Sequence, residues 1–267
     1  MTKIMNKWII KRQSGASRKL KNPILIEGLP GIGNVGKIAV DFLIDQLDHK
    51  IMYNIYSTSF PHSVFVNDDN LIELPSVTLY SVKLKKRDLM LLSGDVQPVD
   101  EESSYEFSNL IVELAHKHGC KELITLGGIG LGTEPDNPKV YGVANSEIAK
   151  QRFAKLTNKV NFKKIKADAI IGATGLILGL STFKKMYGIS LLVETFGHQF
   201  HIGLKESKAL LKALKDILEI DVKLSELDKA IKREEKEKVK SIADQKKVLS
   251  KTVKRMYHKY SDTSYIG

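Results

Sequence analysis

The sequence predicts an α/β protein, a three-layer sandwich with a mixed, largely parallel sheet, followed by a long C-terminal helical extension. Short apolar runs of strand length alternate with segments of helical periodicity, and glycine-rich turns join them. Near residue 222 the composition changes, and charged residues dominate the rest of the chain. We therefore expect an α/β domain at 1–222, a charged, coiled-coil-like helical extension at 223–260 and a flexible tail at 261–267.

Strands are expected where apolar residues run together or alternate with polar ones. Residues 24–26 and 89–92 are wholly apolar, which is typical of buried strands. Residues 64–66 and 71–74 flank a polar turn and form a hairpin, which makes the sheet mixed. The expected strands are 7–10 (a short edge strand), 23–27, 51–56, 64–66, 71–74, 77–84, 89–92, 123–126, 140–143, 169–171 and 189–193.

Helices are expected where apolar residues recur every three or four positions. Asn34 is the candidate N-cap of the first helix, Gly119 closes the second, and Asn145 caps the third. The expected helices are 35–47, 103–118, one from the cap at Asn145 to about 156, one after the strand at 169–171, and 205–218.

Four of these strands end in polar or glycine-rich turns, at Glu27-Gly28, Gly94-Asp95, Gly127-Gly128 and Glu194-Thr195. Ligands of open α/β sheets bind outside the carboxyl ends of the strands. Glu27, Asp95 and Glu194 could therefore converge there as a metal site or an acid–base pair. The alternative is that each carboxylate binds the amides of its own turn. The histidines of His116-x-His118 and His198-x-x-His201 are interpreted as ordinary surface groups. The candidate pocket comprises Gly31, Gly33, Asn34, Gly36, Gly94, Asp95, Gln97, Gly128, Gly130, Thr174, Gly175 and Glu194.

The first glycine turn matches two nucleotide-binding patterns. Gly31, Gly33 and Gly36 fit G-x-G-x-x-G, and the stretch from Gly31 to Lys37 fits the start of a phosphate loop. A phosphate loop needs Ser or Thr next, but position 38 is Ile, and no ribose-binding acid follows the next strand. We favour glycines that let helix and strand pack closely, and we expect no catalytic residue, metal or cofactor.

Composition restricts the class of protein. The 267 residues are 42% hydrophobic, which supports a core, and neither a membrane span nor a signal peptide is visible. The single cysteine, Cys120, excludes an internal disulfide framework and suits a reducing cytoplasm, where we expect the protein to act. The net charge is +11, of which the stretch 226–259 carries +6. Since few aromatic residues lie among these cations, we do not expect a nucleic-acid partner.

The order of the turns resembles the archaeal proteasome assembly chaperone family, which is proteasome assembly chaperone 2-like. The resemblance covers roughly residues 20–225 and rests on six stretches within it: Gly28–Gly36, Ser93–Pro98, Leu126–Gly130, Val140–Ala144, Ile171–Leu176 and Leu192–Thr195. It implies a nucleoside phosphorylase-like sandwich and an ATP-independent chaperone without a catalytic set. It also implies proteasome α-subunits as partners, docked through a tail of hydrophobic residue, tyrosine and any residue. In this chain the tyrosine stands one position earlier.

The C-terminal extension is expected to join copies of the chain. Its apolar residues recur at near-heptad spacing, and so narrow a stripe needs a partner helix. We therefore expect a homo-oligomer and no membrane association. The expected partner-binding residues are Ile242, Leu249, Val253, Met256, Tyr265, Ile266 and Gly267. The functional alternatives are a nucleoside- or nucleotide-binding enzyme or sensor that uses the strand-end glycine loops, and a scaffold acting through the C-terminal helix.

Overall fold

The structure is a computed structural model that describes residues 2–5, 7–17, 19–163, 165 and 167–236. The chain divides into a unit of Met1–Lys223 and a second unit of Leu224–Gly267. Of the second unit the structure describes 224–236, which are helical from 225. Most of the predicted extension and the whole predicted tail therefore lie outside the described residues.

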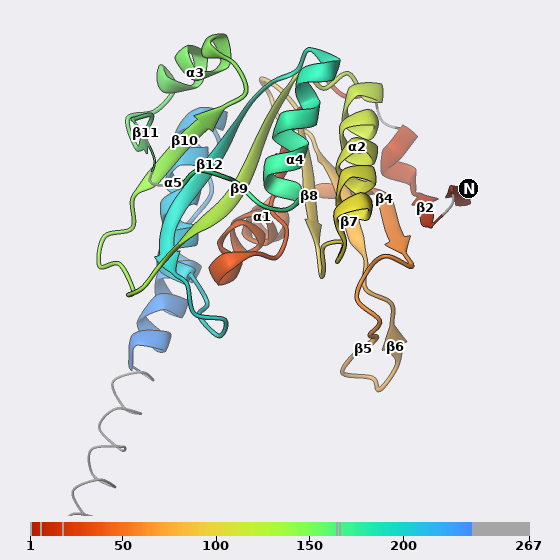
Figure 1. Cartoon of the computed structure of the whole chain (residues 1–267), viewed down its shortest axis with the longest axis horizontal. Helices are drawn as coiled ribbons and strands as arrows, with labels where there is room; N and C mark the ends of the chain where they lie inside the picture. The colour runs from red at the N-terminus through yellow and green to blue at the C-terminus, as the bar shows by residue number, and fades with distance from the viewer. Residues whose placement is uncertain (1, 6, 18, 164, 166, 237–267) are drawn as a thin grey trace, which may run out of the picture. The chain divides into compact units, whose positions relative to one another are not determined.

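In the described part of the chain, ten strands form one sheet, in the order β1-β2-β4-β7-β8-β3-β9-β12-β10-β11 (Figure 1). The strands are β1 (Thr2–Met5), β2 (Trp8–Arg12), β3 (Ile24–Glu27), β4 (His49–Ser57), β7 (Val77–Val82), β8 (Leu89–Gly94), β9 (Glu122–Leu131), β10 (Val140–Ala144), β11 (Val160–Asn161) and β12 (Tyr187–Phe196). The four central strands, β8, β3, β9 and β12, are parallel. Antiparallel pairing on both sides makes the sheet mixed, so the expectation of a largely parallel sheet holds only for its centre.

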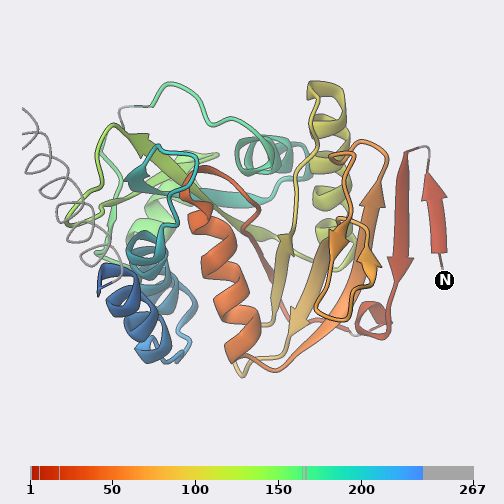
Figure 2. The same cartoon turned by 90° about the horizontal axis from the view of Figure 1, so that it is seen from below.

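Helices cover both faces of this sheet, which gives the predicted three layers (Figure 2). On one face α2 (Glu101–Lys117) packs against α4 (Ala173–Leu180), and on the other α1 (Val35–Gln46) packs against α5 (Leu204–Leu218). The short α3 (Glu147–Ala154) contacts β10 and β12. The described part of the first unit also contains three 3₁₀ turns, η1 (Ser14–Ser17), η2 (Ile32–Asn34) and η3 (Ser181–Lys184). None of the helices described is both long enough and apolar enough to cross a bilayer.

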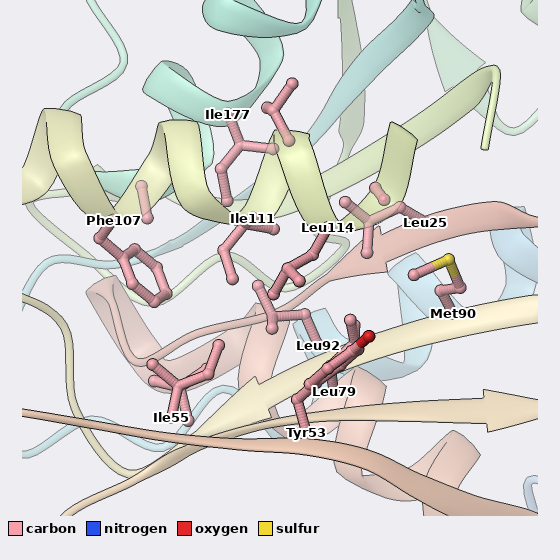
Figure 3. Close-up of a cluster of buried hydrophobic side chains, with 14 of the residues drawn as sticks. Leu25, Tyr53, Ile55, Leu79, Met90, Leu92, Phe107, Ile111, Leu114 and Ile177 are labelled. Atoms are coloured by element: carbon pink, nitrogen blue, oxygen red, sulfur yellow. The ribbon is translucent and has the colours of Figure 1, made fainter. Parts of the chain in front are cut away.

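A core of buried apolar side chains lies between the sheet and the helices α2 and α4 (Figure 3). Leu25 from β3 and Leu92 from β8 lie with Phe107 and Ile111 of α2 in one buried cluster. Leu25 alternates with side chains on the opposite face of β3 that are equally buried, as expected of a central strand covered on both sides. The wholly apolar runs of the sequence therefore mark the middle of the sheet.

The N-terminal strand and the hairpin depart from the sequence prediction. β2 is not an edge strand, because β1 pairs with its outer side. The hairpin, β5 (Phe65–Val66) and β6 (Ile72–Glu73), forms a separate two-stranded sheet. Both sides of β4 are already paired, with β2 and β7, so the hairpin between β4 and β7 finds no place in the main sheet. Figure 1 shows it beyond the ends of the strands.

The predicted strand at 169–171 is wrong, since these residues form no strand and Ile171 is 92% exposed. After β11 the chain must cross from the sheet edge to the face on which α4 packs, and β10 already occupies the position beside β12. The cap of α3 is also corrected. Ser146 caps it by accepting a hydrogen bond from the Ala149 N–H at 3.2 Å, whereas the Asn145 amide donates to the Met186 carbonyl.

Candidate functional site

The candidate site lies at the edge of the sheet where the parallel strands end. Glu27 is the last residue of β3, and its side chain is completely buried. Its Oε1 accepts a hydrogen bond from the Leu29 N–H at 3.1 Å. The hydroxyl of Thr174, the second residue of α4, lies 3.5 Å from the same oxygen. Its Oε2 is buried and has no hydrogen-bond partner among the residues that the structure describes. Glu27 is thus a buried acid with half of its carboxyl group unsatisfied.

Burial raises the pKa of Glu27 from its ordinary value of 4.5 to about 7. The Leu29 and Leu126 amides and the Thr174 hydroxyl oppose this shift, because they favour the ionised form. Both protonation states are therefore populated near neutral pH. Within the described chain, however, no second ionisable side chain is hydrogen-bonded to Glu27.

The three carboxylates that could have converged at this edge have separate hydrogen-bond partners. Asp95 lies in the loop after β8, where its Oδ2 accepts from the Ser76 N–H at 3.2 Å. Glu194 lies in β12 and accepts from the Tyr141 hydroxyl of the neighbouring β10 at 3.0 Å. β8 and β12 are three strand spacings apart, roughly 14 Å. Glu27 binds an amide of its own turn, as the alternative interpretation expected, whereas Asp95 binds an amide of the loop before β7.

Two predicted turns are parts of strands. β9 continues through Gly127, Gly128 and Gly130, and β12 continues through Glu194 and Thr195, because each strand pairs with the other along its whole length. Parallel pairing with an adjacent long strand outweighs the weak strand propensity of glycine.

The glycines of this edge provide close packing. A Cβ atom on Gly36 would lie 2.5 Å from the carbonyl oxygen of Leu126, and one on Gly28 would lie 2.2 Å from that of Gly36. A Cβ on Gly128 would lie 2.6 Å from the carbonyl oxygen of Ile32. These distances require glycine, so α1 and its loop lie directly on β9.

The first glycine turn has other contacts than a phosphate loop would make. Gly33 has a φ of 64° and Asn34 a φ of 51°, both left-handed. Asn34 occupies the N-cap position of α1, but its side chain makes no capping hydrogen bond. Lys37, the lysine that a phosphate loop would direct at phosphate, pairs with Asp41 at 2.8 Å. The space around the Cβ position of Gly31 is open.

Gln97 joins two of the strand-end loops. Its amide Nε2 donates to the carbonyl of Pro30, after β3, and its Oε1 accepts from the Ala173 N–H, at the start of α4, at 3.0 Å. Gly172 has a φ of 86°, and a Cβ there would lie 2.9 Å from Gln97 Oε1. Gly175 packs on a backbone carbonyl of the preceding loop at a Cβ distance of 2.3 Å. Gln97 therefore fixes α4 to the loop that follows β3.

Gly94 and Gly130 occupy separate places along this edge. Gly94 ends β8, where a Cβ would lie 2.7 Å from a side-chain carbon of Val77. Gly130 lies in β9, where a Cβ atom would lie 3.5 Å from a side-chain carbon of Ile32.

A buried polar network at this edge was missed by sequence reasoning. His201 Nε2 lies 2.7 Å from Glu206 Oε1, and the Thr195 hydroxyl donates to the same oxygen at 3.0 Å. All three side chains are buried, so the interpretation of His201 as a surface group is wrong. Ser207 donates to the carbonyl oxygen of Val35 at 3.0 Å and thereby ties α5 to α1. The only sequence signal was an acid in the first turn of α5, five residues after a histidine.

Other predicted features fall outside these interactions. The expected partner-binding residues, 242 to 267, lie outside the described residues. In the described ranges no three His, Cys, Asp or Glu side chains group as metal ligands would.

Comparison with known proteins identifies relatives over most of the chain. A family model, the PAC2 family, matches residues 25–242. The solved structure of Pyrococcus furiosus PbaB, described as an archaeal proteasome activator, is 32% identical, with a TM-score of 0.82 over 89% of this chain and 99% of that chain. P. furiosus PbaA, described as an archaeal homolog of proteasome-assembly chaperone, shares the fold at 23% identity, with a TM-score of 0.74 over 96% of this chain and 99% of that chain. An uncharacterized protein of Methanocaldococcus jannaschii, MJ1210, is 31% identical over 97% of this chain and 98% of its own length.

Proposed function

Because this chain belongs to the PAC2 family, we propose that it is an ATP-independent assembly chaperone that binds proteasome core subunits, specifically α-subunits, as a homo-oligomer. The similarity to PbaB, a proteasome activator by its description, supports a partner in the same machinery. The expected C-terminal tail would add a second point of attachment.

The observation that carries the proposal is the apolar character of the carboxyl edge. β4 runs in the same direction as β8, so the hairpin after β4 lies at the edge where β3, β8 and β12 end. Large apolar side chains are exposed on the loops of this edge and on the hairpin: Ile32, Val64, Phe65, Val66, Leu71, Ile72, Leu74, Val99, Phe200 and Ile202. Exposed apolar surface of this extent marks protein interaction sites in soluble proteins.

The hairpin itself favours a protein partner. An isolated two-stranded sheet is only marginally stable in water and gains from a third strand or a packed face. β5 and β6 have exposed residues throughout, and Ile72 is 75% exposed. A subunit that covers these side chains would bury apolar surface and could extend the short sheet.

Matched phenylalanines provide the test. Phe200, at the carboxyl edge, is 79% exposed, and Phe183, in η3 near the start of β12, is 82% exposed. We expect Phe200→Asp and Ile72→Asp each to weaken binding of the full chain to purified proteasome α-subunits about tenfold or more, because a buried unpaired carboxylate is unfavourable. Phe183→Asp should bind like the unmodified protein. Equal affinity of all three variants would mean that the carboxyl edge does not contact the subunit.

The extension is tested separately. Leu249→Asp with Val253→Asp should convert the oligomer to monomer by light scattering, and deletion of residues 265–267 should weaken α-subunit binding without changing the oligomer. A chain that is monomeric before any substitution contradicts the proposal that the apolar stripe of the extension joins copies of the chain. Unchanged affinity after the deletion would place recognition on the α/β unit or the helix.

The competing proposal, a nucleotide-binding enzyme or sensor, predicts a different result. With Lys37 paired to Asp41 and the glycine loop packed on β9, we expect ATP and NAD to bind no tighter than about 1 mM. Micromolar binding in calorimetry that is lost in Gly33→Val would favour the competing proposal.

A further inference from the structure

A cavity of about 360 Å³ lies at the opposite edge of the sheet, where the parallel strands begin. Pro23 precedes β3, Arg87 precedes β8, Glu122 begins β9, Tyr187 begins β12, and Arg152 reaches the cavity from α3. Five segments that are distant in sequence thus line one concave site. We propose that this cavity binds the phosphate group of a small phosphomonoester, a function separate from protein docking at the carboxyl edge.

Glu122 orients two guanidinium groups at the base of the cavity. Its side chain is buried, and Arg87 donates a hydrogen bond to its Oε2. Arg87 is fixed further by a hydrogen bond of 3.3 Å from its Nε to the carbonyl oxygen of Asn22. Arg152 Nη2 lies 2.7 Å from Glu122 Oε1 in an ion pair. Because a guanidinium has five N–H groups and Glu122 is the one side-chain partner of Arg152 within the described residues, its remaining N–H groups are available to a ligand.

Two further polar residues, Lys121 and Tyr187, line the cavity. Neither the Lys121 ammonium group nor the Tyr187 hydroxyl makes a side-chain hydrogen bond or ion pair within the part of the chain that the structure describes. The ion pairs with the buried Glu122 carboxylate explain why Arg87 and Arg152 lie at this place. They do not explain why an additional cation and a hydroxyl gather at the same place.

The charge of the cavity matches a phosphate dianion. Arg87, Lys121 and Arg152 carry three positive charges against one negative charge on Glu122, which leaves a net +2, and the nearby Lys86 is paired with Glu219. A phosphomonoester carries about −1.5 to −2 at pH 7 and three acceptor oxygens. Arginine forks and a lysine are the usual partners of such a group. The ring of Tyr187 and the apolar Pro23 offer a wall for the carbon part of the ligand.

Calorimetry with the full chain tests the proposal, with inorganic phosphate and AMP as probes and adenosine as the uncharged counterpart of AMP. We expect saturable binding of both anions and none of adenosine. Lys121→Gln and Arg152→Gln should each weaken binding about five- to tenfold, and the double variant should lose it. Binding should also weaken as sodium chloride rises from about 50 to 200 mM.

Lys212→Gln is the matched control, because Lys212 is an exposed lysine of α5 that does not line the cavity. It should leave the affinity unchanged. Thermal unfolding without ligand should be the same for Lys121→Gln and the unmodified protein, since Lys121 makes no side-chain interaction that the described structure contains. The proposal is overturned by absence of saturable phosphate binding at about 10 mM, by equal weakening in Lys212→Gln, or by full affinity in the double variant.

Discussion

Replacement of the buried Glu27 by glutamine should change how stability depends on pH. In the folded protein burial raises the pKa of Glu27 from 4.5 to about 7. The folded state therefore holds a proton that the unfolded chain has already released between these two values. Stability from this group is fully present below pH 4.5 and is lost as the pH rises through 7.

The size of the effect follows from the shift. Each pKa unit corresponds to 1.36 kcal/mol, so ionisation of Glu27 lowers the free energy of unfolding by about 3 kcal/mol in total. Most of this, about 2.5 kcal/mol, falls between pH 5 and pH 8. Glutamine keeps an acceptor for the Leu29 N–H but does not ionise. The free energy of unfolding of Glu27→Gln, measured relative to that of the unmodified protein, should therefore rise by about 2.5 kcal/mol from pH 5 to pH 8.

Urea unfolding at pH 5, 6, 7 and 8 measures this difference, and groups common to both proteins cancel from it. Glu102→Gln, on the exposed first turn of α2, provides the control for exchanging an acid for an amide. A difference between Glu27→Gln and the unmodified protein that stays constant over this range would refute the reasoning. A difference of opposite sign would mean that the amides around Oε1 and the start of α4 hold the carboxylate ionised.

Three further substitutions or treatments test the packing. Gly36→Ala should lower the free energy of unfolding by about 2–3 kcal/mol in urea titration, because its Cβ meets the β9 backbone, whereas Gly31→Ala, in open space, should change it by less than about 0.5 kcal/mol. Cys120 should resist iodoacetamide at pH 8 until the protein unfolds, since burial raises the pKa of its thiol to about 12, and rapid labelling of the native protein would contradict this. Phe107→Ala should destabilise by about 3–5 kcal/mol, and a blue-shifted fluorescence of Trp8 should move to the red, because the two rings lie 5.7 Å apart in the core.

Local sequence patterns were sufficient for the helices and the central strands. The apolar spacing predicted α1, α2 and α5 to within a few residues, because one face of each helix is buried on the sheet. The continuous run at 89–92 predicted a strand covered on both faces, and β8 is buried along its whole length. These features depend on which residues avoid water, a property each short segment carries by itself.

Pairing between distant segments decided the rest. β9 runs through Gly127, Gly128 and Gly130 because β12 lies beside it, and no pattern within these glycines predicts a strand. His201 is buried because it contacts Glu206 at the start of α5, which also accepts a hydrogen bond from Thr195 at the end of β12. The hairpin stands outside the sheet because β2 and β7 already occupy both sides of β4.

The candidate sites divide in the same way. The sequence by itself placed Glu27 and Gly94 at the carboxyl ends of their strands, because the end of a short apolar run is a local feature. Only the tertiary structure decided that Asp95 and Glu194 lie apart, because spatial strand order separates β8 from β12 by two strands. It also brought Arg87, Lys121 and Arg152 to one cavity. These three residues are more than 30 positions apart in the sequence. The periodicity of a single sequence does not show which distant segments end side by side in the fold.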